Sequence, residues 1–281
     1  MRIGVGLPTS TPGGHGPELV EWARRADRGP FTSLGVVDRL AYDCTDPLVA
    51  LSAAAAVTSR VRLVTMVVIG PIRPAAALAA QAASLDALCA GRLTLGVSLG
   101  ARRDDYEAAG ARWADRGRRF SEQLAAMRQI WAGQTDEPVG PRPATPGGPE
   151  LLIGGGSGPS FLRAARYGDG YVHGGGPPRA FAGAAERARA AWVDAGRPGQ
   201  PALWGQSYFG LGDPDAGATY LRNYYAFTGA FAERIAAGLL TTPKAVREHV
   251  NGYAEAGCDE LVLLPATSDP SELDRLADVL S

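Results

Sequence analysis

The sequence is poor in lysine and cysteine. All but one of the 28 basic residues are arginine, and the exception, Lys244, follows a proline at a predicted helix start. This argues against a Schiff-base lysine and against a P-loop, because Lys244 lacks the glycine context of a phosphate-binding loop. The three cysteines, Cys44, Cys89 and Cys258, are too few and too widely spaced for a disulfide framework or a zinc cluster. We expect them to be packing or surface residues, and we expect no metal.

Long hydrophobic runs and a strong charge of either sign are also missing. The first residues, MRIGVGLPTS, lack the apolar run of a signal peptide, and no segment approaches the roughly 18 uninterrupted apolar residues of a membrane span. The formal net charge is −1, so electrostatics favour neither a nucleic acid nor an anionic membrane as partner. We therefore expect a cytoplasmic protein that acts on a small molecule.

What is present is a regular alternation of strand and helix patterns along 281 residues. Helical patterns, such as 16–28, 46–59, 74–90 and 118–131, separate eight segments with the composition of buried strands. These are Arg2–Pro8, Leu34–Asp38, Arg62–Ile69, Arg92–Ser98, Glu150–Gly154, Gly170–His173, Ala202–Leu211 and Glu260–Leu264. Eight such units predict a single α/β domain over 1–281, a (β/α)8 TIM barrel. A doubly wound open sheet is the alternative, weakened because no intact GxGxxG follows a strand.

Two neighbouring strands are both followed by glycines, in the segment LLIGGGSGPSFLRAARYGDGYVHGGG (Leu151–Gly176). Ser157 is a good N-cap for the helix that follows the first strand, and Pro159 suits its first turn. Glycine allows a ligand to approach the main chain closely, and a helix N-terminus favours an anion. The glycines could also serve only to make tight turns, but their repetition after the next strand favours a phosphate site.

Two regions depart from the regular pattern. The segment Gly133–Pro149 is rich in proline and glycine and predicts an irregular loop, either a lid or a spacer. Between the last two strands we expect two helices, Pro214–Ala237 and Pro243–Ala256. The first carries an aromatic stripe, which predicts core packing or a homodimer interface, with a pocket lining as the alternative. The stripe consists of Tyr220, Tyr224, Tyr225, Phe227 and Phe231.

Five segments in order carry a family resemblance: RVRLVTMVVIGPIRP (60–74), LAAQAASLDALCAGRLTLGVSLG (78–100), GRRFSEQLAAMRQIW (117–131), IGGGSGPSFLRAARYGDGY (153–171) and TTPKAVREHVNGYAEAGCDELVLLP (241–265). As an ordered set over nearly the whole chain, they resemble the bacterial luciferase-like monooxygenase superfamily. The resemblance implies a barrel, often dimeric, that binds reduced FMN or the deazaflavin F420 at the C-terminal mouth.

The resemblance also implies roles for individual residues. It places the flavin phosphate on Ser157 and Ser160, with help from Arg118 and from the turn glycines. Thr65, Met66 and Val67 match the position where members often carry a bulge or a non-proline cis peptide beneath the isoalloxazine ring. The glycines implied in cofactor binding are Gly154, Gly155, Gly156 and, in the second turn, Gly174.

One departure from the family pattern follows the second strand. Many members have an acidic residue and then a histidine there, whereas this chain has Asp38 and then Arg39. Arginine stays protonated, so Arg39 can stabilise an anion but is a poor general base. His15 and His173 follow strands and could substitute as site residues, His173 more readily than His15, whereas His249 is expected to be exposed on an outer helix. Asp38, Arg39 and His173 are therefore our catalytic candidates.

The resemblance and the residues together predict a flavin-dependent oxidoreductase. We expect a two-component monooxygenase that uses reduced FMN, supplied by a separate flavin reductase, and oxygen on a small organic substrate. An F420-dependent reductase or dehydrogenase is the first alternative, and a flavin-binding protein without catalysis is the second. A barrel isomerase that binds a phosphate but no flavin would need a carboxylate or lysine base that the sequence does not offer.

Overall fold

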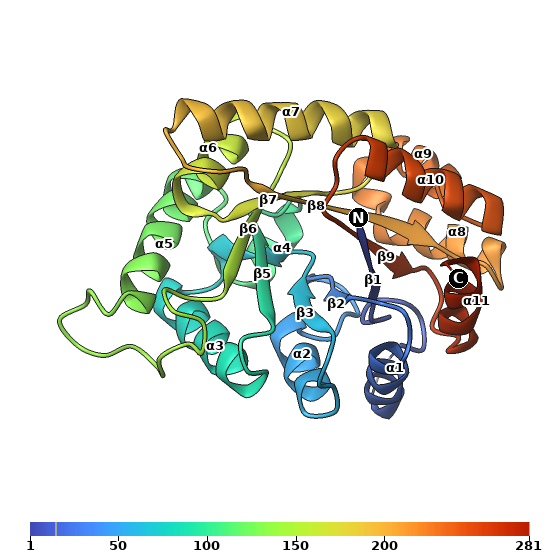
Figure 1. The fold of residues 1–281 in the computed structure, drawn as a ribbon, viewed down its shortest axis with the longest axis horizontal. Helices are drawn as coiled ribbons and strands as arrows, with labels where there is room; N and C mark the ends of the chain where they lie inside the picture. Colours follow the sequence, from blue (N-terminus) through green and yellow to red (C-terminus); the bar gives the residue numbers. More distant parts are fainter. Residues whose placement is uncertain (15, 281) are drawn as a thin grey trace.

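The parallel strands close into a barrel in the computed structural model, which describes residues 1–14 and 16–280 (Figure 1). The strands are β1 (Arg2–Gly6), β2 (Ser33–Val36), β3 (Arg62–Thr65), β4 (Val68–Ile69), β5 (Leu93–Ser98), β6 (Glu150–Gly154), β7 (Gly170–His173), β8 (Ala202–Phe209) and β9 (Glu260–Pro265). Short β3 and β4 both pair with β5, so together they occupy one position of an eight-position ring. β1 pairs with β9 and with β2, which closes the ring and confirms the predicted (β/α)8 barrel.

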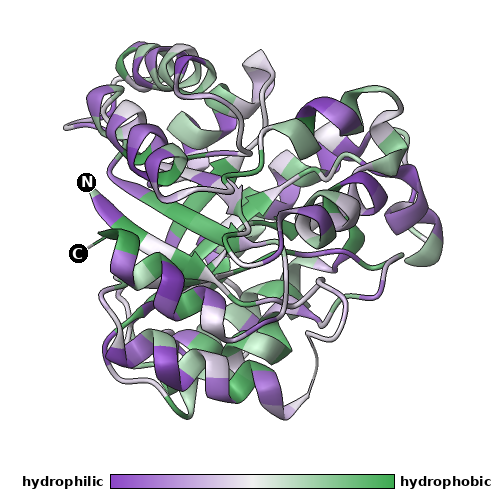
Figure 2. Cartoon of the chain, turned by 90° about the vertical axis from the view of Figure 1, so that its right-hand side faces the viewer, coloured by the Kyte–Doolittle hydropathy of each residue, from purple (hydrophilic) through white to green (hydrophobic). Residues whose placement is uncertain are grey.

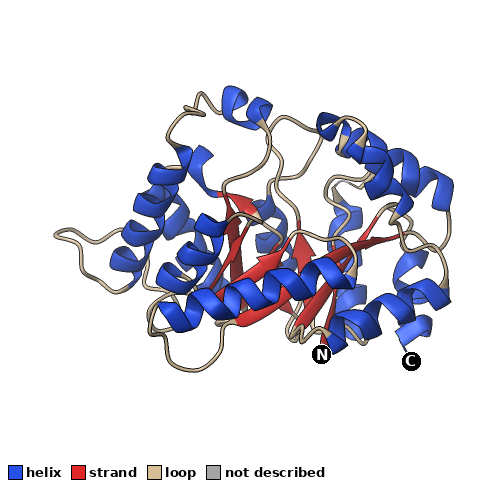
Figure 3. Cartoon of the chain, turned by 90° about the horizontal axis from the view of Figure 1, so that it is seen from above, coloured by secondary structure: helices blue, strands red, loops and turns tan. Residues whose placement is uncertain are grey.

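Helices cover the outside of the barrel, as the view from above shows (Figure 3). They are α1 (Pro17–Arg28), α2 (Pro47–Ala55), α3 (Ala75–Leu88), α4 (Arg103–Ala108), α5 (Arg116–Trp131), α6 (Gly158–Tyr167), α7 (Pro178–Asp194), α8 (Pro214–Tyr224), α9 (Phe231–Ala237), α10 (Pro243–Glu255) and α11 (Ser271–Leu280). Two 3₁₀ turns, η1 (Gly70–Ile72) and η2 (Ala226–Thr228), complete the described structure.

Local sequence explains where two of the helices begin. Asp46 accepts hydrogen bonds from the amides of Leu48 and Val49 at the start of α2, and Thr242 accepts one from Ala245 at the start of α10. In both helices proline occupies the first turn, where its missing N–H costs nothing. These caps fix the first turns of α2 and α10.

The hydrophobic residues form two layers, and the strands are the most uniformly hydrophobic elements (Figure 2). The larger layer lies between the sheet and the helices and includes fully buried Phe120 and Phe181. The smaller layer fills the barrel interior, with Val64, Trp204 and Val262 at its centre. Both faces of each strand are therefore buried, which explains the nearly continuous apolar runs in the sequence.

The structure corrects two sequence-based boundaries. The segment Arg62–Ile69, expected as one strand, is split into β3 and β4, and the Met66–Val67 peptide between them is cis. The expected helix Pro214–Ala237 is also wrong. It stops at Tyr224, passes through η2 and a positive-φ Gly229, and resumes as α9. The aromatic stripe is consequently not continuous: Tyr220 and Tyr224 are buried, whereas Phe227 and Phe231 are exposed.

Other expectations agree with the structure. Residues 133–149 form a loop without helix or strand between α5 and β6. Cys89 and Cys258 are buried and Cys44 is half-buried, all three as free thiols. Within the part of the chain that is described, no helix is both long and apolar enough to cross a bilayer.

Candidate functional site

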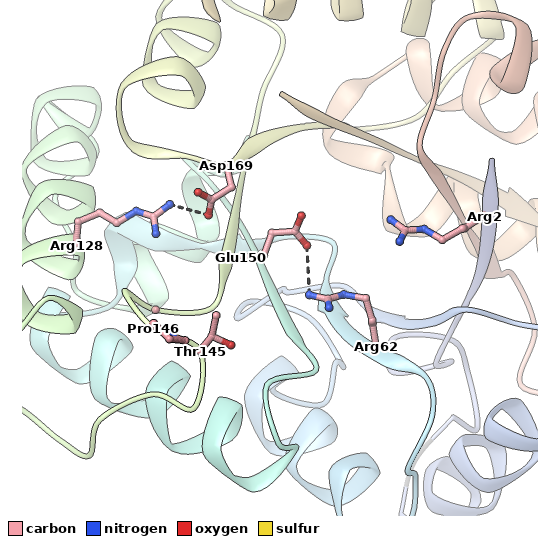
Figure 4. Close-up of a pocket in the computed structure, with 8 residues that line it drawn as sticks. Arg2, Arg62, Arg128, Thr145, Pro146, Glu150 and Asp169 are labelled. Carbon is pink, nitrogen blue, oxygen red and sulfur yellow. Dashed lines mark hydrogen bonds and ion pairs between the residues drawn. The ribbon is translucent and has the colours of Figure 1, made fainter. Parts of the chain in front are cut away.

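Two cavities lie at opposite ends of the strands. The one of about 430 Å³ is at the N-terminal end, where Arg62, Glu150 and Arg2 begin their strands (Figure 4). Its charged residues are all paired: Arg62 with Glu150 at 3.3 Å, Arg128 with Asp169 at 2.7 Å, and Arg2 with Glu260 at 3.0 Å. Residues at this end of a barrel serve stability, whereas catalytic residues of barrel enzymes lie at the C-terminal ends of the strands.

The other cavity, which we call the mouth cavity, has a volume of about 180 Å³ and lies at the C-terminal ends. The residues that line it come from the ends of β2, β3, β4, β5 and β8 and from the segments that follow them. They are Val37, Asp38, Arg39, Met66, Val67, Ile69, Ser98, Gly100, Ala101, Arg102, Asp105, Gln206, Tyr208, Tyr224, Tyr225 and Phe227. Four of the predicted site residues, Asp38, Arg39, Met66 and Val67, therefore share one cavity.

Asp38 is buried and its carboxylate is held by the protein itself. Oδ2 accepts a hydrogen bond from the Ile69 amide at 2.8 Å, and Oδ1 accepts one from Arg73 at 3.0 Å. Burial raises the pKa of Asp38, and the charge of Arg73 opposes that rise. Because both oxygens are occupied, this carboxylate fixes β4 beside β2 and is not a free base.

Arg39 is paired across the mouth with Asp105 of α4. Its Nε donates to Asp105 Oδ2 at 3.0 Å, its Nη2 donates to the Ala41 carbonyl, and both side chains are almost fully buried. The guanidinium also lies 5.0 Å from the Tyr42 ring and 5.2 Å from the Tyr224 ring. Arg39 thus joins the segments that follow β2, β5 and β8. It places a permanent cation where the resemblance implies a titratable histidine in many members.

The glycine turn after β6 lies next to the mouth cavity. A Cβ placed on Gly154 would be 3.3 Å from Ser98 Cβ and 3.5 Å from Val67 Cγ2, two residues of the cavity wall. Gly155 has φ +123°, a conformation that favours glycine. A Cβ on Gly156 would meet nothing within 4 Å, so the backbone there is open. The turn therefore lies against the wall of the mouth cavity.

Ser157 and Ser160 come together at the start of α6. Their hydroxyl oxygens are 3.1 Å apart. Ser157 occupies the N-cap position as expected, but its side chain makes no capping hydrogen bond. The first-turn amides of α6 are thus left without a side-chain cap at the end of a helix where the dipole favours an anion.

Two other expected site residues are engaged elsewhere. Arg118 at the start of α5 is exposed, and its guanidinium pairs with Asp115 at 2.8 Å and with Glu122 at 2.6 Å. His173 does not line the mouth cavity. Its ring lies 5.9 Å from that of Phe181 of α7, on the helix-facing side of β7, and its Nδ1 is 3.3 Å from the Tyr171 hydroxyl. Burial lowers the pKa of His173, and Nε2 is buried without a partner.

The remaining two histidines have different outcomes. His15 lies outside the described residues. The expectation that His249 is simply exposed is wrong, because it is half-buried and its Nε2 is 2.6 Å from the Ser207 hydroxyl. Burial lowers its pKa. Ser207 and His249 are 42 residues apart, so no local pattern could have revealed the pair.

Sequence reasoning missed part of the cavity wall. Asp105 follows β5 in a short helix that was not predicted, and Gln206 and Tyr208 alternate inward along β8. The alternation could have identified the β8 pair, since Trp204, Gln206 and Tyr208 share one face of the strand. Thr65, in contrast, is fully buried, and its hydroxyl donates to the Gly96 carbonyl, so it supports the strands rather than the surface. Gly174, in the second turn, has open space beside its Cα.

Comparison with known proteins agrees with this architecture. An F420-dependent glucose-6-phosphate dehydrogenase from Beutenbergia cavernae is 35% identical over 174 residues, 55% of this chain and 52% of that protein. The oxygenase component of a flavin-dependent trigonelline monooxygenase from Acinetobacter baylyi is 31% identical over 121 residues, 41% of this chain and 34% of that protein. The chain spans about half the length of the curated relatives it matches, or less.

The same fold occurs in the crystal structure of the monooxygenase RslO1 from Streptomyces bottropensis. That structure superimposes with a TM-score of 0.78 at 24% identity and covers all of this chain and 97% of its own. The sequence profile described as luciferase-like monooxygenase matches residues 1–257. The chain therefore belongs to the luciferase-like monooxygenase family, whose members are oxidoreductases dependent on a flavin or on F420.

Proposed function

We propose that this protein is the oxygenase of a two-component system, which uses reduced FMN from a separate flavin reductase, and oxygen, on a small organic substrate. The observation that carries the proposal is that the glycine turn lies against the wall of the mouth cavity. A ligand with a phosphate at one end and a flat ring at the other fits this arrangement. The phosphate would lie at the start of α6 and the ring against Met66 and Val67.

The residues at the turn fit a phosphate. The hydroxyls of Ser157 and Ser160, which share one hydrogen bond and so keep one proton free, offer a donor at a helix N-terminus, and so does the open backbone of Gly156. A bound reduced flavin would supply the electrons that activate oxygen. The protein would contribute binding of the phosphate, orientation of the ring and exclusion of water by the aromatic side chains around the cavity.

The absence of a free base favours oxygenation over alcohol oxidation. A dehydrogenase that removes hydride from an alcohol must also accept the hydroxyl proton. Among the described residues lining the mouth cavity, Asp38 and Asp105 are the carboxylates. Asp38 is held by Arg73 and one backbone amide, and Asp105 by Arg39 and two backbone amides. Arg39 and Arg102 cannot accept a proton at neutral pH.

An F420-dependent reductase or dehydrogenase is the second candidate. It is favoured by the 35% identity to the glucose-6-phosphate dehydrogenase from Beutenbergia cavernae. The same phosphate site would serve either cofactor. The choice between FMN and F420 therefore depends on which of their two ring systems the mouth cavity binds.

Two measurements test the proposal. The absorbance spectrum is recorded while the protein is titrated with FMN and, separately, with F420. The reduced complex is then mixed with oxygen in a stopped-flow instrument. We expect binding of FMN and an oxygen-dependent change that is altered by substrate. Binding of F420 alone, with no reaction with oxygen, would instead establish the second candidate. Binding without turnover of any substrate tried would indicate a flavin-binding protein.

A further inference from the structure

The mouth cavity has an aromatic wall with two hydroxyl groups in contact. Tyr208, near the end of β8, and Tyr225, just after α8, both line the cavity, and their hydroxyl oxygens are 3.1 Å apart. Their rings meet edge to face, with centroids 6.0 Å apart. Tyr224 and Phe227 extend the same wall. The wall thus offers flat apolar surface and a polar point within it.

This pair of hydroxyls keeps one hydrogen-bond donor to spare. Two hydroxyl groups carry two protons, and the contact between Tyr208 and Tyr225 uses only one of them. Burial, followed by the neighbouring tyrosines, raises the pKa of Tyr208, and burial raises the pKa of Tyr225. Both phenols therefore stay protonated at neutral pH and act as donors.

The charges around the cavity are already balanced. Arg39 is paired with Asp105, Arg102 with Asp104, and Asp38 with Arg73. A charged ligand would have to leave water for a cavity that offers it no free counter-charge. Neutral ligands do not meet this cost.

We propose that the Tyr208–Tyr225 pair holds the carbonyl oxygen of a neutral aromatic substrate, such as an aryl ketone or aryl aldehyde. The spare hydroxyl proton is donated to the carbonyl oxygen, and the ring of the substrate packs on Tyr224 and Phe227. Describing this ligand as the substrate rests on the proposed function. Its binding to the cavity does not, so the two can be tested separately.

The test compares three small fluorinated probes by ¹⁹F NMR. They are 4-fluoroacetophenone, 1-ethyl-4-fluorobenzene, which lacks the oxygen, and 4-fluorobenzoate, which is charged. We expect the ketone to bind about tenfold more tightly than the ethyl compound, the size of one good hydrogen bond. We expect the benzoate to bind more weakly than the ketone. Equal affinity for the ketone and the ethyl compound, or tightest binding of benzoate, would overturn the proposal.

Variants test whether the preference for the ketone depends on the hydroxyls of Tyr208 and Tyr225. The double variant Tyr208→Phe/Tyr225→Phe should lose the preference for the ketone, whereas each single variant keeps one hydroxyl and should retain part of it. Tyr42→Phe is the matched control. It removes a hydroxyl from the same aromatic cluster, but that hydroxyl donates to Asn223 and does not line the cavity. A preference that survives in the double variant, or is lost equally in Tyr42→Phe, would contradict the assignment.

A spectroscopic signature separates hydrogen bonding from general damage to the wall. The carbonyl stretch of ¹³C-labelled acetophenone should shift to lower frequency on binding and lose that shift in the double variant. The single variants allow the same measurement if the double variant does not fold. FMN titration of each variant reports on the cofactor site independently. A ketone preference without FMN binding would refute the proposed function alone, and FMN binding without the preference would refute this inference alone.

Discussion

At the scale of single residues, the two serines at the start of α6 give the most direct test of the cofactor site. Replacing Ser157 and Ser160 with alanine should weaken FMN binding by about 1–3 kcal/mol for each hydrogen bond lost to the charged phosphate. Riboflavin, which has no phosphate, should bind equally well to the parent protein and to the variant. If the parent protein binds FMN and riboflavin with equal affinity, the turn does not hold the phosphate.

Removing one partner of the Arg39–Asp105 pair should lower stability, and removing the second partner as well should restore part of it. Arg39→Met leaves Asp105 charged and almost fully buried, and should lower the free energy of unfolding by about 3–5 kcal/mol. Arg39→Met/Asp105→Asn removes both charges and should recover part of that loss. Urea denaturation measures both changes. A double variant no more stable than the single one would show that the pair does not act as a unit.

The variant Arg39→Lys tests whether turnover depends on the planar shape of the cation at this position. Lysine keeps the charge but not the planar group that reaches Asp105 and the Ala41 carbonyl together. We expect this variant to fold and to lose much of its turnover, because the segments joined at the mouth are no longer held in one geometry. Unchanged kcat and KM would mean that any cation suffices there.

The buried histidines predict a dependence of stability on pH. Burial lowers the pKa of His249 and His173, so below about pH 6.5 the unfolded chain binds more protons than the folded one. The contribution of the two buried, neutral histidines to the free energy of unfolding is complete above pH 6.5. It is lost as the pH falls toward their lowered pKa values in the folded protein. The free energy of unfolding, measured by urea denaturation at each pH, should therefore decline between pH 7 and pH 5.5. His249→Gln should make this slope shallower, by the equivalent of less than one bound proton. An unchanged slope would contradict the assigned pKa shift.

Much of the site could be predicted where it depends on short stretches of sequence. The GGGS turn, Asp38 and Arg39 all follow strands that the apolar runs identify, and the structure places them at the C-terminal end of the barrel. Their partners could not be predicted. Asp105 is 66 residues from Arg39, and Ser207 is 42 from His249. Such pairs exist only once the barrel has brought separate βα units together.

At the scale of elements, the break after α8 shows why spacing alone misleads. Tyr220, Tyr224, Phe227 and Phe231 are spaced as on one helical face, yet the chain leaves the helix at Tyr225 and turns at Gly229. Burial of Tyr220 and Tyr224 inside the molecule outweighs the local preference for a continuous stripe. The break also brings Tyr225 and Phe227 to the mouth cavity.

The turn at Gly229 predicts opposite effects of one substitution at two sites. A Cβ would meet no atom within 4 Å at either Gly229 or Gly183, so only the backbone differs. Gly229 has φ +60° and ψ −132°, a conformation that is almost exclusive to glycine, and Gly229→Ala should destabilise by about 1–3 kcal/mol. Gly183 lies inside α7, and Gly183→Ala should stabilise by about 0.5–1 kcal/mol. Thermal unfolding of both variants checks this, and a shift of the same sign in both would refute the argument from backbone conformation.

At the scale of the whole molecule, the sequence predicted the barrel because eight buried strands leave few other arrangements. It placed β3 and β4 in one segment, since no residue type marks the interruption at Met66–Val67. The oligomeric state was predicted on weaker grounds than the fold. The stripe that suggested a homodimer divides in the structure: Tyr220 packs in the core, and Phe231 is exposed. Tyr224, Tyr225 and Phe227 line the mouth cavity, which agrees with the alternative expectation of a pocket lining.

We still expect a homodimer, with Phe231 as the exposed aromatic side chain of α9 that does not line the cavity. Light scattering at micromolar concentration should then give about twice the 29.2 kDa of one chain. Phe231→Asp should shift the mass toward the monomer if α9 forms the interface. A monomeric mass for the unmodified protein would reject the dimer.

The loop between α5 and β6 extends from the side of the barrel (Figure 1). It joins the end of a helix to the start of a strand, so it belongs to the end of the barrel opposite the mouth cavity. Gly148 packs on Trp131 and Thr145 bonds to Asp86, whereas Asp136 and Glu137 are exposed. A peptide tag or a surface anchor inserted between Asp136 and Glu137 should therefore immobilise the protein with its mouth facing solution, open to substrate and to a reductase.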